Sequence, residues 1–205
     1  MLLAIDTSAG TSVAVVDDTA TGTDARVLGE ASSPGTRGHA EAIGRLIDEA
    51  LRAADAAPAA ITGVVAGMGP GPFTGLRVGI AAARTFAAAR GIPVHPVCSH
   101  DAIAEGRTAP TLVVTDARRR EVAWSVHRAG ERIAGPELAR PEELPDVVEG
   151  YAALDRVDAA EVSAASLARV AARLLAAGRP TGPDQPLYLR APDVTMPGAP
   201  KRVTA

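Results

Sequence analysis

The sequence has 205 residues and a formal net charge of −3, with 47% hydrophobic and 22% charged residues. This length and composition supply a core for one large or two small domains and exclude a disordered chain. Aromatic residues make up 2%, too few for a row of exposed rings on which single-stranded bases stack. The single cysteine, Cys98, excludes a disulfide, and no leader or membrane-spanning pattern is visible. We expect a cytoplasmic protein with no membrane partner.

The first half alternates short apolar runs with helical patterns. Between His39 and Ala54 the apolar residues recur at i, i+3, i+4, i+7 and i+8, which predicts one helix with a charged outer face. An Ala-rich segment after a Gly-Pro loop predicts a second helix that ends at Gly91. The expected order is three strands, helix, strand, helix, strand, at Leu2–Ile5, Ser12–Val16, Arg26–Ala31, His39–Ala54, Ile61–Ala66, Thr74–Arg90 and Val94–Val97.

The second half repeats the opening pattern of strands. Three extended stretches are expected at Thr111–Thr115, Glu121–Val126 and Arg132–Leu138, then a partly irregular Pro141–Asp158 and a helix at Ala164–Ala177. Two such units side by side give an α/β actin-like ATPase fold, built from two ribonuclease H-like lobes of which the second is reduced. We expect an N-terminal lobe at 1–106, a smaller C-terminal lobe at 107–190 and a tail at 191–205.

A hydroxyl-rich turn follows the first strand and is a candidate phosphate loop. Its Asp6, Thr7, Ser8 and Gly10 combine an acid at a strand end with backbone N–H groups that can cradle phosphate. An ordinary hairpin explains the same residues equally well. Pairing of Asp6 with Asp116 around a metal ion is a weaker alternative, because two aspartates fall short of a nuclease-type cluster.

The glycine-rich segment Gly67–Gly79 leads into the second helix. It lacks the lysine of a Walker A loop, and Pro72 and Thr74 interrupt the dinucleotide pattern of glycines. Close helix packing is therefore the preferred interpretation. The residue four after His39 is Ile43, so no helical histidine pair exists for a metal ion. We expect neither a metal site nor a catalytic residue.

Several of these segments together resemble the bacterial TsaB (YeaZ) family. They are Leu3–Ser8, the helix His39–Leu51, the loop Gly69–Gly79 and the ending Tyr188–Arg190. The resemblance implies an actin-like subunit that has lost catalysis. Its paralogue TsaD transfers threonylcarbamoyl to N6 of adenosine 37 in tRNAs that read ANN codons. The family member binds and activates TsaD, and the ATPase TsaE joins the resulting dimer.

The resemblance also implies a partner surface on the two N-terminal-lobe helices. We expect it to include His39, Ile43, Phe73, Leu76, Arg77, Ile80, Ala83 and Arg84. No cofactor is expected to bind tightly, with ATP or ADP held at the junction with partners. The only basic run is Arg118–Arg120, so tRNA is expected to be contacted only through the complex. Homodimerisation through the same helices is left open, and an active actin-like kinase or ATPase is the alternative function.

Overall fold

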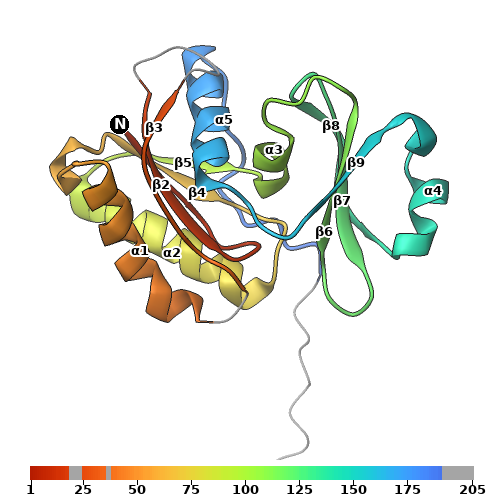
Figure 1. Cartoon of the computed structure of the whole chain (residues 1–205), viewed down its shortest axis with the longest axis horizontal. Helices are drawn as coiled ribbons and strands as arrows, with labels where there is room; N and C mark the ends of the chain where they lie inside the picture. The colour runs from red at the N-terminus through yellow and green to blue at the C-terminus, as the bar shows by residue number, and fades with distance from the viewer. Residues whose placement is uncertain (19–24, 36–37, 191–205) are drawn as a thin grey trace, which may run out of the picture.

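The computed structural model describes residues 1–18, 25–35 and 38–190, and their strands form a five-stranded and a four-stranded sheet (Figure 1). The strands are β1 (Leu2–Asp6), β2 (Thr11–Asp17), β3 (Arg26–Ser33), β4 (Gly63–Gly67), β5 (Val94–Val97), β6 (Thr111–Asp116), β7 (Val122–Arg128), β8 (Glu131–Ala139) and β9 (Asp155–Ala159). The α-helices are α1 (His39–Ala53), α2 (Phe73–Arg90), α3 (Ser99–Ala104), α4 (Leu144–Val147) and α5 (Ala164–Ala176). Short 3₁₀ turns lie at Pro58–Ala60, Pro141–Glu143 and Tyr151–Ala153.

The first sheet has the order β3-β2-β1-β4-β5. β1 pairs antiparallel with β2 and parallel with β4, because the connection through α1 carries the chain from β3 across β2 and β1 before β4 begins. α1 and α2 cover one face and α5 covers the other (Figure 1). Strands β1 and β4 are buried along their whole length, as expected of strands with helices on both faces.

Helix α5 belongs to the first lobe although it follows the second lobe in sequence. Its apolar stripe, from Ala164 to Leu174, packs with Leu2, Ala4 and Val65 in one buried cluster. The backbone N–H of Ala164 donates to the Ser12 hydroxyl at 3.0 Å. The expected lobe at 107–190 is therefore corrected: its own sheet ends with β9, and α5 returns because the first sheet needs cover on its second face. The expected tail at 191–205 lies outside the described residues.

The second sheet has the order β8-β7-β6-β9 and repeats the topology of the first. β6, β7 and β8 form the antiparallel meander, and β9 pairs parallel with β6 as β4 does with β1. In place of a long crossover helix it has the four-residue α4, whose Leu144 is buried with Trp124 and Val148. Two ribonuclease H-like lobes with a reduced second lobe make this an actin-like ATPase fold, as expected.

The short helix α3 joins the two lobes through buried polar contacts. His100 Nδ1 lies 2.7 Å from the Ser125 hydroxyl and its Nε2 lies 2.9 Å from the Thr115 hydroxyl. Asp101 accepts from Arg132 Nε at 2.9 Å and pairs with His127 Nε2 at 3.0 Å. These contacts hold strands of the second sheet against the first lobe. Within the described residues, no helix is long and apolar enough to cross a membrane.

Candidate functional site

The candidate phosphate loop is enclosed rather than open. Asp6 is 1% exposed, and its carboxylate accepts from the Ser8 backbone N–H at 2.8 Å, the Ser8 hydroxyl at 2.6 Å and the Ser99 hydroxyl at 2.6 Å. Burial raises the pKa of Asp6 above its ordinary value, and these hydrogen bonds oppose that rise. The Asp6 carboxylate therefore stabilises the turn that follows β1.

The glycine-rich segment closes over that loop. The Thr7 hydroxyl donates to the Gly75 carbonyl at 2.8 Å and accepts from the Gly79 N–H at 3.1 Å. A Cβ at Gly79 would lie 2.3 Å from Thr7 Oγ1, and one at Gly71 would lie 2.7 Å from the Ser8 backbone. These glycines are needed because helix α2 and its loop touch the hairpin directly. The expectation that Asp6, Thr7, Ser8 and Gly10 hold a phosphate is corrected, since all four are buried in this packing.

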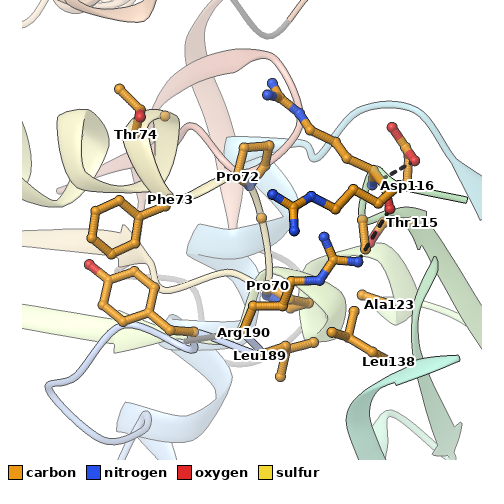
Figure 2. A pocket seen from close by; sticks show the side chains of 16 residues that line it. Pro70, Pro72, Phe73, Thr74, Thr115, Asp116, Ala123, Leu138, Leu189 and Arg190 are labelled. Carbon is orange, nitrogen blue, oxygen red and sulfur yellow. Dashed lines mark hydrogen bonds between the residues drawn. The ribbon is translucent and has the colours of Figure 1, made fainter. Parts of the chain in front are cut away.

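A pocket of about 500 Å³ lies beside this closed loop, between the two lobes (Figure 2). Three segments distant in sequence line it: the loop before α2 with the first turn of α2, the β6–β7–β8 meander and the chain after α5. The lining residues are Pro70, Gly71, Pro72, Phe73, Thr74, Gly75, Thr115, Asp116, Ala117, Arg118, Arg119, Ala123, Leu138, Tyr188, Leu189 and Arg190. The second lobe thus contributes directly to this cavity.

The β6–β7 turn presents arginine to this pocket on an unusual backbone. Arg118, Arg119 and Arg120 have φ angles of 63°, 55° and 64°, three successive non-glycine residues in the left-handed region. The Arg118 N–H donates to Asp116 Oδ1 at 3.0 Å. Arg190 forms an ion pair with Glu121 and lies close to the Arg118 carbonyl, so the chain end and the turn are linked.

The segment before Arg190 is bound along helix α2. Arg77 Nε donates to the Tyr188 hydroxyl at 3.0 Å, and its guanidinium lies 3.7 Å from the centre of the Phe73 ring. Arg84 pairs with the Asp184 carboxylate at 2.7 Å. Two arginines expected at a partner surface therefore make contacts within the chain, and the Phe73 ring contacts both Arg77 and Tyr188, with 4.8 Å between the centres of the two rings.

Four more of the expected partner residues are in the core. Leu76, Ile80 and Ala83 are at most 4% exposed and pack against the first sheet. His39 is buried, and its Nδ1 lies 2.7 Å from the Thr11 hydroxyl. These four side chains offer no surface to a partner, which corrects the expectation: the stripe that appeared free covers the sheet.

Helices α1 and α2 also carry apolar side chains that are only partly buried. Ile43, Ile47, Ala82 and Phe86 are half-buried at the margin of the core, and we call these four residues the apolar seam. Ile43 is the one residue of the expected partner set within it. Gly44 and Ala81 lie exposed on α1 and α2, and residues this small permit another helix to approach closely.

Sequence reasoning missed two groups of residues at the site. Tyr188 and Asp184 follow the last helix without periodicity, and only their position after the α5 return brings them to α2. The lobe-joining residues His100 and His127 also have no local sequence pattern that predicts their contacts with Ser125, Thr115 and Asp101. In the described ranges, no three His, Cys, Asp or Glu side chains gather in a group that could hold a metal ion.

Comparison with known proteins extends across most of the chain. Residues 28–175 match the family model described as TsaD: tRNA N6-adenosine threonylcarbamoyltransferase. An uncharacterized protein of Mycobacterium tuberculosis is 42% identical over 199 residues, covering 94% of this chain and 92% of that protein. An uncharacterized protein of Mycobacterium leprae is 47% identical over 146 residues, and this match spans only 40% of that longer relative. The structure of YeaZ from Pseudomonas aeruginosa superimposes with a TM-score of 0.71 at 25% identity, covering 92% of this chain and 99% of YeaZ.

Proposed function

Because this chain belongs to the family described as TsaD, tRNA N6-adenosine threonylcarbamoyltransferase, and is of its YeaZ (TsaB) type, we propose that it is a non-catalytic partner subunit in tRNA threonylcarbamoylation. In this proposal it binds and activates a TsaD-type subunit, which carries threonylcarbamoyl to N6 of adenosine 37 in tRNAs that read ANN codons. A TsaE-type ATPase joins the pair. Activation is a population shift, which requires that this chain fit one state of its partner better than another.

The observation that carries the proposal is the closure of the phosphate loop. In an actin-like enzyme, the turn after the first strand must admit a nucleotide phosphate. Here the Asp6 carboxylate accepts three hydrogen bonds from its own lobe, and the Thr7 hydroxyl bridges two backbone groups of α2. Opening this loop would leave several buried polar groups unpaired, at about 1–3 kcal/mol each. Such a loop supports a structural role better than phosphoryl transfer.

The partner surface follows from the side chains that remain accessible. The apolar seam runs between α1 and α2, with Gly44 and Ala81 exposed on the two helices. A pair of helices on a TsaD-type subunit would complete a four-helix arrangement over this seam. We place any ATP or ADP at that junction of subunits. The alternative occupant of the seam is a second copy of this chain.

Light scattering after size-exclusion chromatography tests the surface, with this chain alone and mixed with its cognate TsaD-type subunit. We expect a heterodimer with the wild type and with Ala152→Glu, an exposed control on the second lobe. Ala82→Glu places a charge in the seam and should abolish association while the circular dichroism spectrum stays unchanged.

A tRNA modification assay tests the role itself. Omitting this chain should reduce threonylcarbamoyl transfer at least tenfold, and adding Ala82→Glu should fail to restore it. Undiminished transfer without this chain, or ATP turnover by this chain alone, would instead favour the active kinase or ATPase.

A further inference from the structure

The pocket between the lobes divides into a charged side and an apolar side. Figure 2 shows guanidinium groups gathered on the side of Asp116, away from the ring of Phe73. The arginines that line it are Arg118, Arg119 and Arg190, and the apolar lining comes from Pro70, Pro72, Ala123, Leu138 and Leu189. We propose that this pocket holds one nucleotide unit of an RNA strand, with its phosphate on the arginines and its sugar and base against the apolar side. The proposal rests on the proposed function, for which it names a contact with the RNA substrate.

Charge favours a phosphate at this place. Among the described residues that line the pocket, there are three arginines and one carboxylate, that of Asp116, and Glu121, which is not among them, pairs with Arg190. A guanidinium can donate two parallel hydrogen bonds to phosphate oxygens, which makes arginine the common phosphate ligand in proteins. The volume of about 500 Å³ is within the range of about 300–1,000 Å³ found for ligand pockets.

The backbone holds the arginines in place before any ligand arrives. Three successive residues at Arg118–Arg120 are in the left-handed region, which is unfavourable for side chains other than glycine. Two backbone hydrogen bonds close the turn. The Ala117 N–H donates to the Glu121 carbonyl at 3.0 Å, and the Glu121 N–H donates to the Arg118 carbonyl at 3.1 Å. Strained backbones of this kind gather at ligand sites, where they fix side chains in advance.

The N-terminus of helix α2 adds to the positive electrostatic potential that the arginines create in the pocket. Phe73, Thr74 and Gly75 form its first turn and line the pocket, and Pro72 at the N-cap makes no side-chain cap bond. The first N–H groups of a helix have no acceptor within the helix and carry a partial positive charge. The residues of this first turn line the same pocket as the arginines, so both features favour an anion there.

The arrangement suits a phosphodiester strand better than a free nucleoside triphosphate. A triphosphate usually arrives with magnesium held by carboxylates, and the lining residues that the structure describes offer only Asp116, which is already bonded to its own turn. The arginine run also continues outward to Arg120, which is exposed beyond the lining. A strand that leaves the pocket therefore meets a further cation, whereas a free nucleotide would not use it.

Fluorescence anisotropy with a labelled tRNA transcript tests the proposal on the full chain at low salt. Arg119→Glu should weaken binding at least tenfold, and Arg119→Ala should lower the slope of log K against log salt by about 1. Arg119→Lys keeps the charge and should retain most of that slope. The matched control is Arg128→Glu, at the other end of β7 and about 20 Å from the turn, which should stay within twofold of wild type.

Three results would overturn the proposal: no RNA binding by the wild type, equal losses for Arg119→Glu and Arg128→Glu, or binding of ADP in equilibrium dialysis that RNA does not compete away. Association with the TsaD-type subunit is measured on the same variants. If association persists while Arg119→Glu leaves RNA binding unchanged, this inference alone fails. If association is absent while the Arg119 effect on RNA remains, the proposed function alone fails.

Discussion

Acidification should weaken the junction between the lobes through His100. Its imidazole is fully buried between the Ser125 and Thr115 hydroxyls. Burial, with a smaller contribution from the nearby His127, lowers the pKa of His100 from 6.5 to about 3. The folded protein therefore holds the ring neutral, whereas the unfolded chain protonates it near pH 6.5.

The sign and size of the effect follow from these two values. A lowered folded pKa contributes stability that is complete above pH 6.5 and is lost as the pH falls toward 3. Between about pH 7.5 and pH 5, His100 binds a proton in the unfolded state but not in the folded state. This protonation stabilises the unfolded state by a free energy equivalent to about 1.5 pH units. At about 1.4 kcal/mol per unit, the loss is about 2 kcal/mol.

Urea unfolding at those two pH values measures the loss in wild type and in His100→Gln. The glutamine amide can donate to one hydroxyl and accept from the other without titrating. The variant should thus lose about 2 kcal/mol less than wild type on acidification. His95, whose pKa is also lowered by burial, is present in both proteins, so its contribution to the pH dependence cancels in the comparison. Asp101, which Arg132 and His127 hold in its charged form against the effect of burial, titrates below this window.

Equal pH dependence of the two proteins would refute this reasoning. If His100→Gln proves too unstable to compare, the ring itself provides the measurement: its NMR proton shifts in wild type should stay constant down to about pH 5. A shift midpoint near 6.5 would show that the imidazole is protonated in the folded state and would contradict the buried neutral ring.

The remaining predictions concern packing, the chain end and the thiol. Gly79→Ala should cost about 2–3 kcal/mol in urea unfolding, because its Cβ would lie 2.3 Å from a threonine hydroxyl; Gly44→Ala, with open space around it, should be neutral or stabilise by up to about 1 kcal/mol. Equal effects would contradict this contrast. Arg84→Ala removes the pair with Asp184 and should speed proteolysis at the chain end, while global stability changes by less than about 1 kcal/mol; an unchanged cleavage rate would show that other contacts hold the segment. Cys98 is buried, and its pKa is raised to about 12 by desolvation, so Ellman's reagent should react slowly at pH 8 until urea is added; rapid reaction in the native protein would contradict the burial.

The sequence predicted most of the first lobe because its elements are marked locally. Apolar runs and helical periodicity identified β1, β2, β4 and both long helices, with boundaries that differ from the structure by one or two residues. β9 was missed because Asp155–Ala159 is mostly charged and exposed, and only its pairing with β6 defines it as a strand. The sequence pattern of a strand is weak when the strand is defined mainly by its pairing with one neighbouring strand.

Placement in three dimensions explains the errors at the candidate site. The stripe of Leu76, Ile80 and Ala83 was correct as a helical face, but periodicity cannot say which neighbour that face meets. The loop beginning at Asp6 has the composition of a phosphate loop, and only the approach of Gly79 shows that it is closed. The pocket was not predicted, since its three lining segments come together only in the fold.

The return of helix α5 to the first sheet makes the order of synthesis differ from the order of the lobes. Leu2 and Ala4 leave the ribosome first, yet the apolar surface that covers them arrives with Leu167 and its neighbours. β5, the last strand of the first sheet, ends at Val97 and α5 ends at Ala176. At about 5–20 residues per second, the complete sheet waits roughly 4–16 seconds with one apolar face uncovered. The first lobe therefore cannot complete its packing before the second lobe has been synthesised, and one apolar face of its sheet stays exposed until α5 emerges.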